Sequence, residues 1–127
     1  MLPKIISALL VVAGIIHLLP LSGVLGAERL AALYGLSFEE PNLLLLMRSR
    51  ALLFGLLGAF MLYAAWRPTL QPLALFGGMV SVLGFLLLAW SGPGYNDALR
   101  RVVIADWVAL ACLALAALLY LVARGKA

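Results

Sequence analysis

The sequence predicts an all-α fold, an integral membrane bundle of four transmembrane helices. Hydrophobic residues make up 66% of the chain and charged residues 11%, and the mean hydropathy is +1.16. Soluble domains have about 45–50% apolar and about 25% charged residues, so this composition indicates a membrane protein. Four apolar runs approach the roughly 20 residues that cross a bilayer as a helix. They cover about residues 2–19, 43–66, 70–90 and 102–122, and we expect a single domain over residues 1–127.

The first span contains the single histidine, His17. Ala13 and Gly14 precede it by four and three residues, so His17 shares a helix face with small residues, which let membrane helices approach closely. A lysine near the start also gives this span some features of a signal peptide. Leu25 before Ala27 matches the small-x-small cleavage pattern poorly. We therefore expect a retained helix, with cleavage as the alternative.

The connection between the first and second spans is the only long one, and its segment GAERLAALYGL predicts a short interfacial helix. The segments RPTLQP and SGPGYND predict tight turns after the second and third spans, because proline and glycine interrupt helices. Aromatic and arginine side chains near span ends favour the headgroup level. The expected interfacial anchors are Arg29, Arg50, Arg100, Trp66 and Trp90.

The second span contains two arginines, Arg48 and Arg50, which are about 200° apart on a helix. Arg48 projects within about 20° of Gly55 and Ala59, and small residues at that spacing are typical of close helix packing. We therefore expect Arg48 to face the interior of the bundle. Arg50, stacked above Phe54, is expected to reach the headgroups.

The fourth span combines charge with a stripe of small residues. Arg101 begins the stripe, and Asp106 flanks it more than one helical turn inside the membrane. An ionised side chain at depth costs about 2.5–3.5 kcal/mol on insertion scales, so Asp106 should have a partner. The lone cysteine, Cys112, lies in the same stripe and is expected only to pack.

Four residues from three spans should therefore converge on one half of the bundle: His17, Arg48, Arg101 and Asp106. They form either a structural network that ties the helices together or a pocket for a ligand. Two inward arginines against one aspartate leave positive charge, which suits a phosphate, a carboxylate or a quinone carbonyl. No resident cofactor is predicted, although a lipid or a quinone would fit. A single histidine and a single cysteine cannot form a zinc site, and nothing indicates a nucleic-acid partner.

The placement of charge predicts the orientation. With four spans, both termini and the loop around residue 67 share one side, which carries only the bases Lys4, Arg67, Arg124 and Lys126. All five acids lie toward the other side, together with five arginines. If some of those arginines are buried, the positive-inside rule places both termini in the cytoplasm.

Three segments together resemble the DoxX-like family of small bacterial four-helix membrane proteins: SALLVVAGIIHLLPLSGVLGAERLAALYGL, EPNLLLLMRSRALLFGLLGAF and NDALRRVVIADWVAL. The resemblance covers nearly the whole chain. It implies inner-membrane residence, an association with redox or quinone metabolism, and charged family positions at Arg48, Arg101 and Asp106, but no defined reaction. Some members carry the label phosphopantetheine adenylyltransferase, a soluble enzyme with an HxGH-type motif. The nearest match here, GIIH, lies within an expected transmembrane helix, so the sequence does not support that activity.

Three functions fit the sequence. The first is a binding module for a lipid, a quinone-like or an anionic small molecule, or an accessory subunit of a larger membrane complex. The second is a small oligomeric transporter or channel, and the third is an intramembrane enzyme that uses His17 and Asp106 for proton transfer. Polar residues gather at one end of the bundle, which favours a one-ended pocket over a transport path and a binding role over an enzyme. The expected partners are the bilayer and, through small-xxx-small surfaces, a second copy of the chain.

Overall fold

The computed structural model describes residues 2–125, which form five α-helices, two 3-10 helices and no strand. Four segments are long and apolar enough to cross a membrane: Leu2–Leu25, Pro41–Ala65, Pro68–Ser91 and Asp97–Gly125. The expected all-α bundle of four long apolar helices is thereby confirmed. In chain order the elements are α1 (Leu2–Leu18), η1 (Leu19–Leu25), α2 (Ala27–Tyr34), α3 (Pro41–Ala65), η2 (Pro68–Leu70), α4 (Gln71–Ser91) and α5 (Asp97–Gly125).

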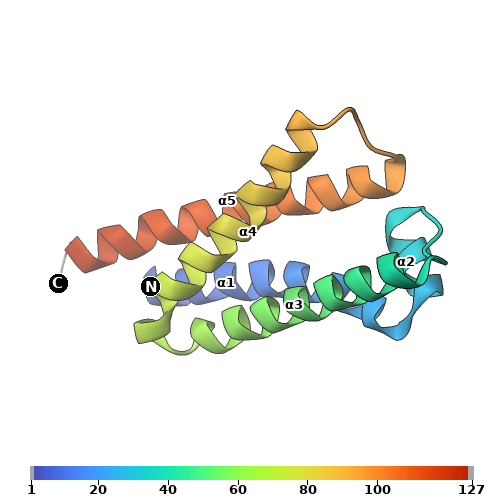
Figure 1. The fold of residues 1–127 in the computed structure, drawn as a ribbon. Helices are drawn as coiled ribbons and strands as arrows, with labels where there is room; N and C mark the ends of the chain where they lie inside the picture. Colours follow the sequence, from blue (N-terminus) through green and yellow to red (C-terminus); the bar gives the residue numbers. More distant parts are fainter. Residues whose placement is uncertain (1, 126–127) are drawn as a thin grey trace.

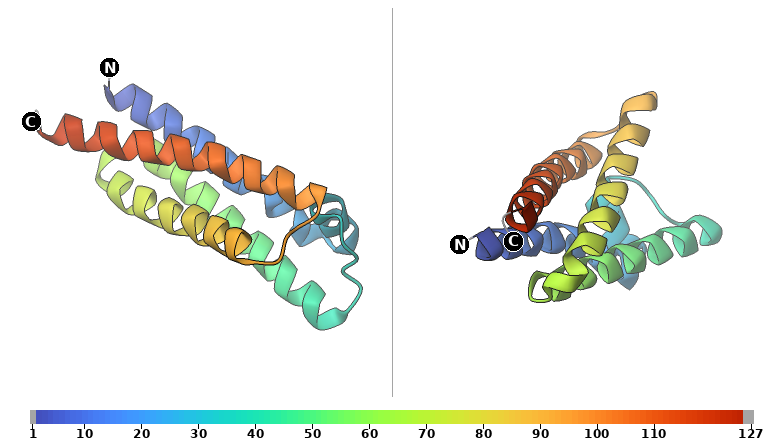
Figure 2. Two further views of the ribbon diagram at one scale, coloured as in Figure 1. Left: turned by 90° about the horizontal axis from the view of Figure 1, so that it is seen from above. Right: turned by 90° about the vertical axis from the view of Figure 1, so that its left-hand side faces the viewer.

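Helix α1 contacts α3 and α5, and α4 completes the bundle by contacting α3 and α5 as well. Helix α4 crosses the bundle at an angle, so that its C-terminal end stands away from α3 (Figures 1 and 2). The chain termini lie at one end of the bundle, and α2 lies at the opposite end (Figure 1). We call these the terminal end and the loop end.

The connections at the loop end form where residues interrupt helices. Gly35 ends α2 in the left-handed conformation, with φ of 68°, which glycine adopts at little cost. Glu40 caps α3, because its carboxylate accepts hydrogen bonds from the backbone N–H groups of Asn42 and Leu43 at 3.1 and 2.8 Å. These bonds stabilise the ionised carboxylate and lower the pKa of Glu40. The short helix predicted for this connection is found here as α2.

The apolar core has two parts. The larger part lies within the bundle and contains the fully buried Leu10 and Met61. The smaller part lies under α2, where Leu30, Tyr34 and Phe38 are buried together. Helix α2 is therefore held by its own side chains against the loop end, and this brings Tyr34 to the bundle.

Helices α1 and α3 approach each other closely where Gly14 meets Gly58, and both glycines are buried. A Cβ atom added to Gly58 would lie 2.7 Å from the carbonyl oxygen of Gly14, which leaves no room for a side chain. Gly55 faces Leu21 of η1, and Ala59 is exposed. The close packing predicted for this span is therefore present at Gly55 and Gly58, but not at Ala59.

Candidate functional site

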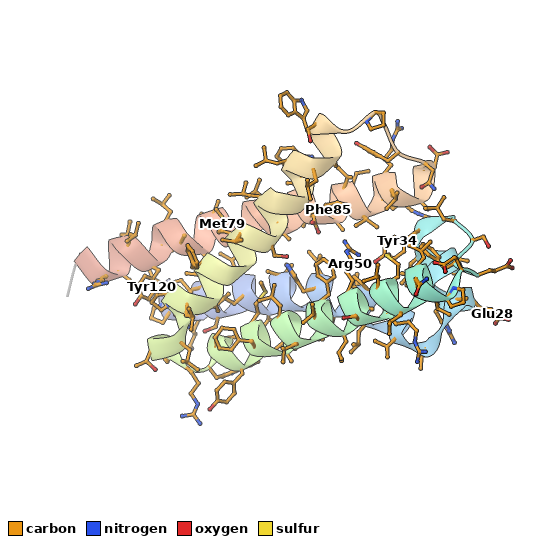
Figure 3. The ribbon with its side chains drawn as sticks, viewed as in Figure 1. Glu28, Tyr34, Arg50, Met79, Phe85 and Tyr120 are labelled. Atoms are coloured by element: carbon orange, nitrogen blue, oxygen red, sulfur yellow. The ribbon has the colours of Figure 1, made fainter. Side chains whose placement is uncertain are left out.

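Arg50 projects from α3 into the loop-end half of the bundle, near Tyr34 and Phe85 (Figure 3). Its Nη1 donates a hydrogen bond to the Tyr34 hydroxyl at 2.8 Å. Its guanidinium carbon lies 4.4 Å from the ring centre of Phe54, 5.6 Å from that of Tyr34 and 5.9 Å from that of Phe85. Such cation–π contacts stabilise a guanidinium that has lost part of its water. Within residues 2–125 one hydrogen bond is found for Arg50, so most of its five N–H donors stay available.

Arg48 lies on the outer face of the bundle, so the orientations predicted for the two arginines are wrong and are reversed in the structure. Its Nε donates to the carbonyl oxygen of Val24 in η1 at 2.8 Å, and its side chain is exposed. The buried face of α3 is centred near Ala51 and Gly58, and the two arginines flank that centre at about 80° on either side. The side that carries Arg50 faces Tyr34 of α2 and Phe85 of α4, whereas the side that carries Arg48 and Gly55 meets the peripheral η1.

His17 is buried on α1, with 3% of its surface exposed. Its Nδ1 lies 2.8 Å from the carbonyl oxygen of Ala13, and its Nε2 lies 3.3 Å from the hydroxyl oxygen of Ser81. Its ring centre is 5.9 Å from that of Phe54, which also packs against Arg50. Both ring nitrogens therefore have protein partners, and the histidine connects α1 to α4.

Asp106 is 9% exposed on α5 and lines a cavity of about 290 Å³ between α1, η1, α2 and α5. Tyr34 and Arg101 line the same cavity, and most of the remaining wall is apolar. Arg50 is close enough to act electrostatically on the Asp106 carboxylate, and no hydrogen bond to that carboxylate is found within the described part of the chain. The carboxylate therefore keeps unused acceptor positions at the edge of the cavity.

The structure brings together a different set of residues from the one predicted. His17 and Asp106 are buried, but Arg101 is exposed beside the Asp106 cavity and Arg48 lies outside. Arg50, predicted as an interfacial anchor, is half-buried, while the other predicted anchors Arg29, Arg100, Trp66 and Trp90 are exposed. The polar side chains of the loop-end interior, which we call the polar cluster, are His17, Tyr34, Arg50, Ser81 and Asp106.

Tyr34 belongs to this cluster because of contacts that no local pattern shows. The side-chain amide of Asn96 donates to the Tyr34 carbonyl oxygen at 2.9 Å. The Asn96 side-chain oxygen in turn accepts from the backbone N–H of Leu99 at 2.8 Å, which caps α5. The loop before α5 therefore holds the end of α2 in place. The sequence places Tyr34 in an interfacial helix, but the contact with Arg50 depends on two segments far apart in the chain.

Comparison with known proteins gives no functional assignment: no family model, no curated protein and no solved structure matches this chain. Within residues 2–125 no group of three or more His, Cys, Asp or Glu side chains could hold a metal ion. The features that indicate a function are therefore the geometry of the polar cluster and the hollows around it.

Proposed function

We propose that this chain is a small membrane protein that binds a lipid, a quinone-like molecule or a similar amphiphile in a one-ended polar pocket at its loop end. The observation that carries the proposal is the environment of Arg50. Polar groups that face the hydrocarbon of a bilayer without a hydrogen-bond partner are costly. Arg50 is half-buried among the rings of Tyr34, Phe54 and Phe85 and donates to the Tyr34 hydroxyl, and its unused donors are accessible at the surface of the described bundle rather than enclosed in it. A ligand with a hydrogen-bond acceptor would satisfy them.

The space beside Arg50 supports the same proposal, because two apolar hollows border this side chain. One, of about 340 Å³, is also lined by Met47 and Phe85. The other, of about 270 Å³, lies between α3 and α4 and is also lined by Leu57 and Ser81. Ligand pockets have about 300–1,000 Å³, mostly apolar walls and a few placed polar groups, so the apolar part of an amphiphile would fit here.

The opposite end of the bundle favours binding over transport. Ser7 and Gln71 both donate hydrogen bonds to the carbonyl oxygen of Ala65, so both side chains are bonded to the protein backbone. These two donors are therefore not free to continue the polar cluster toward the terminal end. His17 also has partners at both ring nitrogens, which favours binding over proton transfer to a substrate.

The cellular setting is part of the proposal. We propose a DoxX-like protein of the bacterial inner membrane with both termini in the cytoplasm, on the basis of the sequence resemblance and the charge placement. Association with a second copy or with a larger membrane complex is compatible with this role, because α3 and α4 expose apolar side chains along their length.

Arg50→Gln and Arg48→Gln provide a matched test, since the two arginines are two residues apart on one helix. Protein purified in mild detergent is analysed by native mass spectrometry for amphiphiles that remain bound. We expect the wild type and Arg48→Gln to retain the same molecule, and Arg50→Gln to retain at least about tenfold less, because hydrogen bonds to charged groups contribute about 1.5–3 kcal/mol.

Thermal unfolding in the same detergent shows whether each variant is folded. If Arg50→Gln is unfolded, Arg50→Lys is used, because it keeps the charge but loses the planar set of donors. Equal retention by the Arg50 and Arg48 variants, with both folded, would contradict the proposed site.

A further inference from the structure

The charge balance of the polar cluster constrains the chemistry of the ligand. Arg48 lies outside, and Arg101 lines the Asp106 cavity with an exposed side chain but borders neither hollow beside Arg50. Among the described residues, Arg50 is the half-buried cation that acts on the Asp106 carboxylate. The positive excess expected from two inward arginines is therefore not present. An anionic ligand at Arg50 would bring a second negative charge near Asp106, and charges interact strongly where water is scarce. A neutral acceptor would use the free donors of Arg50 without this repulsion.

We propose that Arg50 donates hydrogen bonds to a neutral carbonyl, the ester carbonyl of a glycerolipid, whose acyl chain lies between α3 and α4. The inference rests on the proposed function and narrows its ligand to an uncharged acceptor from the bilayer. An ester oxygen accepts hydrogen bonds and carries no net charge, so the attraction between Arg50 and Asp106 is kept when the lipid binds.

The arrangement of α3 and α4 provides a route by which a lipid can reach Arg50. The two helices meet where Gly78 packs against Met61 and where Gly77 faces Leu57, whose side chain would lie 3.6 Å from an added Cβ atom. Toward the loop end α4 leans away from α3 (Figure 1). The hollow next to Arg50 begins at this divergence, between Leu57 and Ser81.

The hollow opens to the surface that would face lipid. Leu53 forms part of its wall and is 60% exposed, so a chain lying along Leu53 and Leu57 would stay in contact with the bilayer. A lipid could therefore enter sideways from the membrane, with its polar end reaching Arg50 and its chain remaining in an apolar environment.

The depth of Arg50 agrees with an ester group. Arg50 precedes Trp66 by 16 residues, or about 24 Å of helix at 1.5 Å per residue. With Trp66 at one boundary of a hydrocarbon core of about 30 Å, Arg50 lies a few ångströms inside the other boundary. Glycerolipid ester carbonyls lie at the junction of headgroup and hydrocarbon, within reach of an arginine at that depth.

The test compares two lipids that differ at one carbonyl. Monooleoylglycerol carries an ester, and its oleyl ether analogue lacks the carbonyl but has the same headgroup and chain. Each is titrated into the delipidated full-length protein in detergent, and binding is followed by native mass spectrometry. We expect the ester to bind about tenfold more tightly than the ether. We expect Arg50→Gln to abolish this difference and Arg48→Gln to preserve it.

Oleate tests the charge preference with the same chain. At alkaline pH, where oleate is ionised, the wild type should bind it more weakly than monooleoylglycerol. Asp106→Asn removes the negative charge beside Arg50 and should reverse that order, which a merely structural role of Asp106 would not do. Equal binding of ester and ether, or tighter binding of oleate by the wild type, would overturn the ester assignment.

The results distinguish a failure of the ester assignment from a failure of the proposed function. If an amphiphile co-purifies through Arg50 but the ester is not preferred over the ether, the pocket stands and the ligand class is wrong. If no amphiphile co-purifies and none of the three probes binds, both proposals are wrong.

Discussion

At the scale of single residues, the environment of a side chain separates two chemically identical arginines. Arg48 donates to a backbone carbonyl at the exposed edge of η1. Arg50 is half-buried among three aromatic rings and bonded to the buried Tyr34. An exposed interaction of a charged group contributes little because water competes for it, whereas a desolvated guanidinium depends on each partner it has. The contact between Arg50 and Tyr34 is therefore a polar link between α2 and α3, beside the apolar contacts of Leu44 and Met47 with the core under α2.

Tyr34→Phe tests this link with little change in shape. The substitution removes the acceptor of Arg50 Nη1 and leaves the ring in the small core under α2. We expect the free energy of unfolding in detergent micelles to fall by roughly 1–3 kcal/mol, because a partly buried charged donor loses its partner. Tyr63→Phe on α3, the helix that carries Arg50, is the control, since Tyr63 is 54% exposed, and should change stability by less than about 0.5 kcal/mol. Similar losses in both variants would show that the Tyr34 hydroxyl does not support Arg50.

At the scale of helices, the crossing of α1 and α3 sets the distance between loop-end side chains of these two helices. Gly14 and Gly58 face each other there with backbone atoms in contact range. Small residues allow such an approach, and in membranes the packing of closely spaced helices replaces much of the hydrophobic driving force. His17 lies one turn from Gly14, so the position of its ring relative to Phe54 depends on this crossing.

Two glycine-to-alanine substitutions should therefore have opposite effects. In Gly58→Ala the new methyl group would meet the Gly14 carbonyl oxygen, and overpacking of this kind costs about 1–3 kcal/mol. In Gly84→Ala on α4 the methyl group would meet open space, and alanine is favoured over glycine in a helix by about 0.8–1.0 kcal/mol. Thermal unfolding in detergent should show a lower melting temperature for Gly58→Ala and an unchanged or higher one for Gly84→Ala. Destabilisation of equal size at both positions would show that the crossing is not the cause.

At the scale of the whole molecule, the bundle has two unlike ends. The termini lie at one end, and α2 lies at the other, where Tyr34 and Arg50 of the polar cluster are found (Figures 1 and 3). The charges of the terminal end that lie in described residues are Lys4, Arg67 and Arg124, and no acid accompanies them. Lys126, also predicted for this side, lies outside the described residues. Four exposed arginines lie toward the loop end, namely Arg29, Arg48, Arg100 and Arg101, so the count of bases alone does not fix the orientation. The proposed orientation, with the terminal end in the cytoplasm and the pocket near the periplasmic face, is therefore tested directly.

Single cysteines test this orientation in a Cys112→Ala background. Ser37 and Ser91 are exposed at the loop end, and Thr69 is exposed in the η2 turn at the terminal end. An impermeant maleimide added to intact cells should label Ser37→Cys and Ser91→Cys, and should label Thr69→Cys only after the cells are opened. The reverse pattern would invert the topology and would place the polar cluster near the cytoplasm.

The number of long helices and the positions of the breaks between them follow from the sequence, because apolar length and helix interruption are local properties. The runs around residues 2–19, 43–66, 70–90 and 102–122 correspond to α1, α3, α4 and α5, and the short helix expected between the first two runs corresponds to α2.

The identity of the inward arginine does not follow from the sequence in this way. The helical phase gives the angle between Arg48 and Arg50 but not the neighbour on each side of α3. Gly55 marks a close contact, as its size suggests, yet the contact is with the peripheral η1. Arg48, which lies on the same face of α3, is therefore directed outward. The interior side was settled by the packing of α2 and α4 against Arg50, because contacts between distant segments depend on the positions of whole helices rather than on any local pattern.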